Sequence, residues 1–318
     1  MNLSRRSFLG GIGAMAAVPC VFAKAKASRD PNLTVLLSDV HVNGVPGGPA
    51  YQLEKFEQMV DEILKLNPLP SRAIVFGDLA WLYGRKEDYQ ASLNGLKRLE
   101  AAGIPVTIGM GNHDRRSTFL EVHPLYTKRT KVPGRIVTVC DAGAVDFIML
   151  DALQGTDDRG LADMGPGNGR LDDAQYEWLV EELRKRTKPV FVCSHFPVSG
   201  VVCGKSSLKK LLVHSPCVAG YIHGHDHRWY VGMKFDGWHN PTIKRSLCLP
   251  STGHWGDIGY TLFRTSGDRA VATLVQHDFY FPRPPEKGAP ANPLWDAIVK
   301  DNRNQTCTFT IPGGCAKA

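Results

Sequence analysis

The chain has 318 residues, of which 43% are hydrophobic and 22% are charged, the composition of an ordinary globular protein. Disordered chains, collagen-like fibres and coiled coils are therefore excluded as its main architecture. The formal net charge is +7, but residues 1–25 contain three of the 38 basic residues and none of the 31 acidic ones. Without them, 35 basic and 31 acidic residues leave +4, too small an excess to indicate a nucleic-acid-binding arm.

Residues 1–25 have the pattern of an export signal. Arg5 and Arg6 precede an apolar stretch rich in Gly and Ala, from Phe8 to Ala23, and small residues follow it. The paired arginines predict the twin-arginine export pathway, so the mature chain is expected in the periplasm or outside the cell. A membrane anchor is the alternative, but the apolar stretch is shorter than the roughly 20 residues that span a bilayer.

The cysteines are then expected in an oxidising compartment. The chain has eight, and seven remain if the signal is removed together with Cys20. Lipid attachment at Cys20 is an alternative to removal, disfavoured by the preceding proline. Local disulfides between Cys203 and Cys217 and between Cys307 and Cys315 are plausible, whereas the absence of a CxxC pair gives no support for a zinc ribbon or a redox dithiol.

Short β-rich apolar runs alternate with helical patterns early in the chain, and strands dominate later. One helix has Phe56, Met59, Val60 and Ile63 on its apolar face, a second is expected over Lys86–Ala101, and a third follows a capping Asp172 and buries Tyr176, Leu179, Val180 and Leu183. Strands are expected at Leu33–Ser38, Arg72–Phe76, Pro105–Ile108, Asp146–Leu150, Val190–Ser194, Val218–Ile222, Ser246–Leu249, Tyr260–Arg264 and Ala270–Gln276.

This order predicts an α/β fold in which a two-sheet β-sandwich is flanked by helices. We expect one domain over residues 26–280, after the signal at 1–25. Residues 281–318 are expected to form a proline-rich C-terminal extension, because five prolines lie between Phe281 and Pro293.

Five polar motifs come directly after predicted strands, where the loops of an α/β sheet gather ligands. They are Asp39-Val-His41, Gly77-Asp78, Gly111-Asn112-His113-Asp114, His195 and Gly224-His225-Asp226-His227. Each is weak evidence alone, although Gly-Asn-His-Asp and Gly-His-x-His are more specific than the others, and all five in this order point to one site. Carboxylate, amide and imidazole ligands without thiolate suit Mn, Fe, Zn or Co. Seven ligands exceed one tetrahedral metal and predict two divalent metal ions, with Asp78 as the bridge.

The motif pattern resembles the calcineurin-like metallophosphoesterase superfamily, over about Leu33 to Ala272. The stretch Gly169–His195, with Gln175 and the Trp178-Leu179 pair, is similar to the bacterial, cyclic-nucleotide-phosphodiesterase-like branch. Leu-Ala-Trp-Leu-Tyr after Asp78 departs from the usual continuation, so the substrate pocket is expected to differ. Purple acid phosphatases are less similar, because their pattern lacks a histidine equivalent to His41.

The resemblance implies a metal-dependent phosphoric ester hydrolase, in which a metal-bridging hydroxide attacks a small phosphodiester or phosphomonoester. It implies that one metal is held by Asp39, His41, Asp78 and His227, and the other by Asp78, Asn112, His195 and His225. His113 is expected to protonate the leaving oxygen or stabilise the transition state, with Asp114 orienting its ring. The alternative for His113 is that it only braces the loop.

Other residues near the motifs could have either a structural role or a role at the site. His223 is expected in the core or behind the ligands rather than among them. His254 is a candidate for substrate contact, and Trp81 and Tyr83 either line the pocket or pack in the core. Of Arg115 and Arg116, at least one is expected to be a solvated surface residue and the other could meet a substrate phosphate.

Two other functions remain to be weighed against a phosphoesterase. One is a non-catalytic metal-binding protein on the same fold, which the intact ligand set disfavours. The other is a nuclease, disfavoured because no basic stripe with interleaved aromatic residues is present. The expected partners are therefore a small phosphoester substrate and the twin-arginine export machinery, with no nucleic acid and no stable membrane insertion after processing.

Overall fold

The structure is a computed structural model that describes residues 28–154, 168–232, 245–280, 303–313 and 315. The expected export signal lies outside these residues, as does the proline-rich stretch from Phe281 to Pro293. Within the described residues, no helix combines the length and the apolar character needed to cross a membrane.

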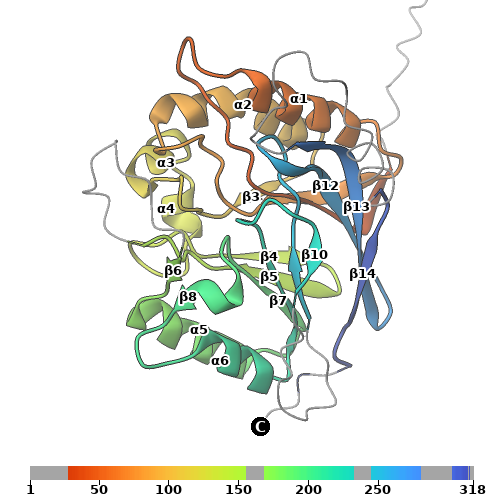
Figure 1. The fold of residues 1–318 in the computed structure, drawn as a ribbon. Helices are drawn as coiled ribbons and strands as arrows, with labels where there is room; N and C mark the ends of the chain where they lie inside the picture. Colours follow the sequence, from red (N-terminus) through yellow and green to blue (C-terminus); the bar gives the residue numbers. More distant parts are fainter. Residues whose placement is uncertain (1–27, 155–167, 233–244, 281–302, 314, 316–318) are drawn as a thin grey trace, which may run out of the picture.

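Two six-stranded sheets pack face to face, with helices on their outer sides (Figure 1). The first sheet has the order β14-β13-β12-β1-β2-β3 and the second β10-β11-β9-β7-β5-β4. Helices α1 and α2 cover the first sheet, and α5 and α6 cover the second. The predicted two-sheet sandwich flanked by helices is confirmed.

The strands of the first sheet are β1 (Arg29–Leu37), β2 (Leu69–Val75), β3 (Val106–Ile108), β12 (Gly256–Ser266), β13 (Arg269–Tyr280) and β14 (Thr306–Thr310). Those of the second are β4 (Thr138–Ala142), β5 (Val145–Met149), β7 (Val190–Cys193), β9 (Val218–His223), β10 (Tyr230–Val231) and β11 (Arg245–Cys248). A separate pair is formed by β6 (Gly169–Arg170) and β8 (Val201–Val202). The helices are α1 (Tyr51–Ile63), α2 (Lys86–Ala101), α3 (Arg116–Val122), α4 (Tyr126–Arg129), α5 (Asp173–Lys185), α6 (Leu208–His214) and the short 3₁₀ turn Val198–Gly200.

The alternation of side chains along each strand distributes the apolar residues between three cores. In β1, Leu36 points between the sheets, while Val35 and Leu37 pack under α1 and α2. In β5, Phe147 points between the sheets and Ile148 packs toward α5 and α6. Burial of both faces explains why these strands appear in the sequence as continuous apolar runs.

Helix α5 begins as predicted, because the Asp172 side chain accepts a hydrogen bond from the backbone N–H of Gln175 at 2.9 Å. Its buried stripe consists of Gln175, Leu179 and Leu183, spaced by four residues. Val180 is 37% exposed, so its expected burial is wrong. The buried face of α5 therefore includes the polar Gln175 and excludes Val180, which rotates it slightly from the face predicted by the apolar residues alone.

The two expected disulfides are wrong. Cys217 is bonded to Cys315, at a sequence separation of 98, while Cys203 and Cys307 are free and buried. The physical reason is β14, a strand that was not predicted from the sequence. β14 pairs with β13 and contacts β9. The chain that follows β14 therefore runs close to Cys217, just before β9. Cys307, on β14, instead points into the core between the sheets.

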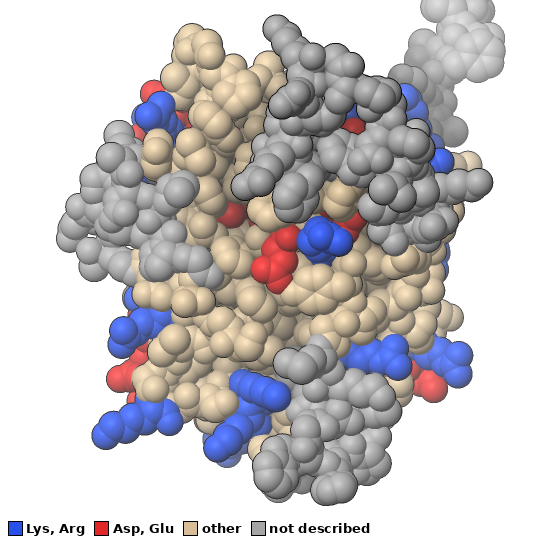
Figure 2. Space-filling model, viewed as in Figure 1, with Lys and Arg blue, Asp and Glu red and all other residues tan. Residues whose placement is uncertain are grey.

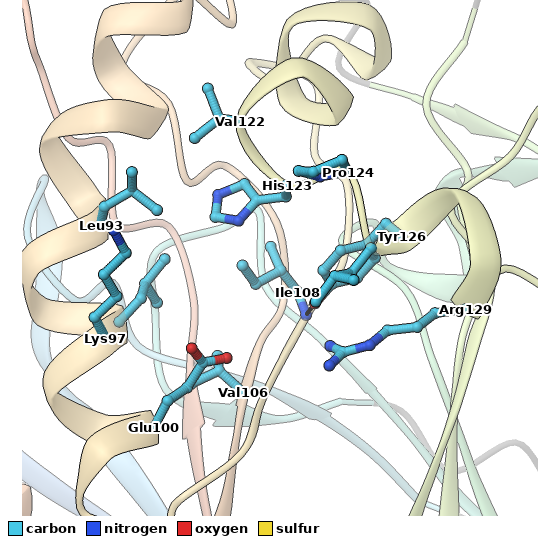
Figure 3. Close-up of a pocket in the computed structure, with 12 residues that line it drawn as sticks. Leu93, Lys97, Glu100, Val106, Ile108, Val122, His123, Pro124, Tyr126 and Arg129 are labelled. Carbon is cyan, nitrogen blue, oxygen red and sulfur yellow. Dashed lines mark hydrogen bonds between the residues drawn. The ribbon is translucent and has the colours of Figure 1, made fainter.

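A cavity of about 260 Å³ lies between α2, β3 and the connection from α3 to α4 (Figure 3). The His123 ring points into it and packs on Phe119, with ring centroids 4.7 Å apart. Its Nε2 is buried and has no hydrogen-bond partner among the described residues. Burial lowers the pKa of His123 from its ordinary 6.5 to about 4.

This cavity predicts an acid-dependent loss of stability. Below pH 6.5 His123 becomes protonated in the unfolded chain, whereas in the folded chain it is protonated only below about pH 4. The free energy of unfolding therefore falls as the pH falls from about 6.5 to about 4. In His123→Phe, the melting temperature should therefore decline less steeply over this range than in the parent protein. His214→Asn, at an exposed histidine, is the control and should follow the parent. Equal slopes for His123→Phe and the parent would contradict the assignment.

Candidate metal centre

The predicted ligand motifs follow strands of both sheets and meet at one edge of the sandwich. The loops after β1, β2 and β3, which are parallel neighbours, carry Asp39, Asp78 and Asn112. The loops after β7 and β9, parallel neighbours in the other sheet, carry His195 and the turn from Gly224 to His227. Because the carboxyl ends of parallel strands share an edge, motifs far apart in sequence become neighbours.

The backbone at this edge is turned into an unusual conformation. Among the described residues, six other than glycine have positive φ, and five of them are predicted ligands: Asp39, His41, Asp78, His225 and His227, with φ between 49° and 74°. Such conformations are disfavoured for residues with a Cβ and cluster at functional sites. Gly77, at φ 94°, lies so close to the next loop that a Cβ would be 2.6 Å from the Gly111 nitrogen.

A first group of side chains comprises Asp39, His41, Asp78 and His227. One ligand atom of each lies within 4.8 Å of the others, and all four residues are buried. His227 Nε2 is 3.1 Å from Asp39 Oδ1, and His41 Nε2 is 3.6 Å from Asp78 Oδ2. A cation between these atoms would have two carboxylates and two imidazoles around it.

A second group shares Asp78 with the first and adds His195 and His225. His195 Nε2 is 3.1 Å from Asp78 Oδ2. The Asn112 side-chain oxygen lies 3.1 Å from His195 Nε2 and 3.0 Å from His225 Nδ1. The structure thus brings all seven predicted ligand residues together, in two adjacent groups that meet at Asp78.

The ring nitrogens facing the centre suit a cation. The Nδ1 atoms of His41, His195 and His227 lie 2.9, 3.0 and 3.2 Å from the carbonyl oxygens of Trp81, Phe76 and Trp255, respectively. A proton on each Nδ1 satisfies these carbonyls and leaves Nε2 with a lone pair toward the carboxylates. Acceptor atoms pressed together in this way repel one another unless positive charge lies between them, so the donor set fits divalent metal ions.

The electrostatics of the side chains themselves agree with this arrangement. Burial alone would raise the pKa of Asp78, but His195 and His113 hold it well below its ordinary value, so the carboxylate is ionised. Burial lowers the pKa of His41, which favours the neutral ring that a metal requires. At His195, burial lowers the pKa but Asp78 and Asp39 raise it to about 9, so a proton there occupies the position that a cation would take.

His113 and Asp114 do not form the pair that the sequence suggested. The His113 Nε2 is 4.0 Å from Asp78 Oδ2, its side chain is 17% exposed, and its Nδ1 has no partner among the described residues. The Asp114 carboxylate accepts hydrogen bonds from the backbone of Gly111 and Ala80 and from the Tyr89 hydroxyl. The expectation that Asp114 orients the His113 ring is therefore wrong: Asp114 fixes two ligand loops to each other.

His254 reaches the same centre from the loop after β11. Its ring centroid is 4.4 Å from that of His41 and 5.4 Å from that of His227. Burial lowers the pKa of His254 to about 4, so the ring is neutral at ordinary pH. Trp81 and Tyr83 are half-buried in the loop after Asp78.

Arg116 is buried and cannot meet a substrate. Its Nε and one terminal nitrogen donate to the two carboxylate oxygens of Asp151, at 2.6 and 2.7 Å. Gln175 holds the backbone of Asp151 from the other side, through hydrogen bonds of 2.9 and 2.8 Å. This pair ties the loop of Asn112 to the second sheet. Sequence reasoning missed Asp151, although it lies two residues after the end of β5, as Asp39 lies two residues after the end of β1.

The family model for calcineurin-like phosphoesterases matches residues 33–229, more than half of the chain. The chain therefore belongs to the calcineurin-like phosphoesterase family, whose members are metal-dependent phosphoesterases, as the fold and the metal-suited site indicate.

The chain is also similar to two individual proteins. Over 93 residues, the chain is 30% identical to a manganese-dependent ADP-ribose/CDP-alcohol diphosphatase of Xenopus laevis, a match spanning 26% of this chain and 26% of that protein. The crystal structure of a dimetal phosphatase from Danio rerio superposes with a TM-score of 0.58 at 17% identity, covering 77% of this chain and 96% of that chain. The second similarity establishes the shared fold.

Removing one partner of the buried Arg116–Asp151 pair should strongly destabilise the protein. Arg116→Met leaves an uncompensated buried carboxylate, a change that costs about 3–5 kcal/mol in comparable pairs. Urea unfolding should show a clearly lower midpoint. Arg184→Met, which removes an exposed pair with Glu181, is the control and should leave the midpoint unchanged. A parent-like midpoint for Arg116→Met would show that the pair does not hold the two loops.

Proposed function

We propose that the protein hydrolyses a small phosphodiester or phosphomonoester with two divalent metal ions at this centre. The observation that carries the proposal is the shared position of Asp78, between a group with Asp39, His41 and His227 and a group with His195 and His225. When bound, two such ions would polarise the phosphoryl oxygens and supply a water of lowered pKa. Asn112 would complete the second group through its side-chain oxygen.

The residues of the chain around the metals have separate roles in this proposal. The ionised carboxylates of Asp78 and Asp39 give the centre the negative charge that attracts cations. His113, partly exposed and beside Asp78, is positioned to donate a proton to the leaving oxygen. His254, neutral and adjacent to His41, would contact a substrate oxygen. Asp114 positions the loops and does not touch the reacting atoms.

A small substrate suits the surface better than a nucleic acid. On the face seen in Figure 2, Lys and Arg side chains are scattered over the margins, the lower part and one position near the centre, with acidic side chains among them. The described residues of that face form no basic stripe that could follow a phosphate backbone. Since the Xenopus relative is named as a diphosphatase, ADP-ribose and a CDP-alcohol belong in the assay beside cyclic nucleotides.

The direct test is hydrolysis of bis(p-nitrophenyl) phosphate and p-nitrophenyl phosphate by the chain without residues 1–25, with Mn, Fe, Zn or Co added. We expect metal-dependent turnover that is absent in Asp78→Asn, because the variant loses the carboxylate that both groups share. The ratio of the two substrates separates diesterase from monoesterase activity. Metal binding without turnover on any substrate tested, nucleotides included, would favour a non-catalytic metal-binding protein.

His113→Ala separates acid catalysis from metal binding. General acid catalysis contributes about 10²–10⁴-fold, so turnover should fall by a factor in that range while the metal content stays that of the parent. A substrate with a good leaving group should lose less activity than one with a poor leaving group, since the first needs no proton. An unchanged rate on both would show that His113 only braces its loop.

We further propose that the protein is exported in folded form through the twin-arginine pathway, from the pattern of residues 1–25. A double variant, Arg5→Lys with Arg6→Lys, should retain full-length protein in the cytoplasm, whereas the parent should appear in the periplasm with the signal removed. Fractionation and intact mass of the product measure both. Export of the double variant at the parent rate would contradict this route.

A further inference from the structure

A second set of side chains of the types that bind metals lies on the other face of the strand that leads to the metal centre. It consists of His223, Asp226 and Cys248, and one ligand atom of each lies within 4.8 Å of the other two. None of the three belongs to the two groups around Asp78. His223 and Cys248 are buried and Asp226 is half-buried.

The sheet fixes two of these residues side by side. Strands β9 and β11 are parallel neighbours, and His223 and Cys248 are partners in their register. The adjacent residues Ile222 and Leu247 point into the core between the two sheets. Alternation along the strands therefore places the side chains of His223 and Cys248 on the opposite face.

Local hydrogen bonds orient two members of the set. His223 Nδ1 lies 2.8 Å from the Gly224 carbonyl oxygen, a contact that needs a proton on Nδ1 and leaves the lone pair on Nε2. The Tyr230 hydroxyl donates to Asp226 Oδ2 and so orients the carboxylate. Backbone and phenol thus act on the imidazole and the carboxylate as outer partners act on the ligands of known metal sites.

The position of Asp226 gives the set a consequence for the metal centre. Asp226 lies between His225 and His227, whose φ values are 74° and 54°. A turn held in this conformation is costly and persists only when its surroundings over-determine it. A cation bound by Asp226 together with His223 and Cys248, at the ends of β9 and β11, would fix the turn on one side. The neighbouring His225 and His227 belong to the groups around Asp78 on the other side.

We propose that His223, Asp226 and Cys248 bind a zinc ion that fixes the turn carrying His225 and His227. Zinc is favoured because it binds thiolate, imidazole and carboxylate ligands in proteins, whereas a buried thiolate is a poor ligand for Mg, Ca or Mn. On binding, the Cys248 thiol loses its proton to solvent. A water or another nearby group completes the coordination.

Cobalt absorption tests this site separately from the proposed phosphoesterase centre, which contains no thiolate. The full mature chain loaded with Co²⁺ should show a thiolate-to-cobalt charge-transfer band in the near ultraviolet. Cys248→Ser should lose the band, whereas Cys203→Ser, at another buried free cysteine, should keep it. Asp78→Asn should also keep the band, because it alters only the other centre.

A second variant keeps the test decisive if Cys248→Ser does not fold. Asp226→Asn changes a half-buried residue and should remove most of the cobalt band, because it should lower the zinc content by up to one ion per chain. No charge-transfer band in the Co²⁺-loaded parent, or a band that persists in Cys248→Ser, would overturn the proposal. Either result would leave the hydrolysis proposed above intact, since that activity is assayed on its own.

Discussion

The geometry of the site depends on five residues whose backbones are held in the left-handed region at the strand ends. Asp39, His41, Asp78, His225 and His227 all have φ near +50° to +75°. A non-glycine residue in such a conformation costs of order 1–3 kcal/mol. The cost is spread over loops of both sheets, so no single loop could keep the arrangement alone. The same left-handed turns therefore bring the predicted ligands together and carry the backbone strain.

The remainder of the fold holds these turns in place. The core between the sheets is closed by aromatic side chains, with Phe263 in edge contact with Phe147 and Phe191 at centroid distances of 5.2 and 5.0 Å. Asp114 fastens one pair of loops through backbone N–H groups, and the Arg116–Asp151 pair fastens the loop of Asn112 to the second sheet. Buried polar groups used in this way limit motion at the centre, because leaving any of them unpaired is costly.

The sequence was sufficient for the nine strands it predicted and for the choice of the seven predicted ligand residues that the structure brings together, because both depend on local patterns: apolar runs, and polar motifs where those runs stop. It was insufficient where position depends on the packing of distant segments. The role of Asp114 required knowledge that its carboxylate faces backbone N–H groups. The disulfide of Cys217 with Cys315 required β14, whose alternating sequence is short and gave no signal. Asp151 could have been predicted from the sequence, because it follows a strand, as the predicted ligands do.

The most direct test of the central claim is electron paramagnetic resonance of the Mn²⁺-loaded chain. If Asp78 bridges two metal ions, the spectrum should show two manganese ions in exchange coupling, and Asp78→Asn should remove the coupling. Control spectra of Cys203→Ser should match the parent. A spectrum of isolated ions in the fully loaded parent, with no coupling at any loading, would contradict a shared binuclear centre.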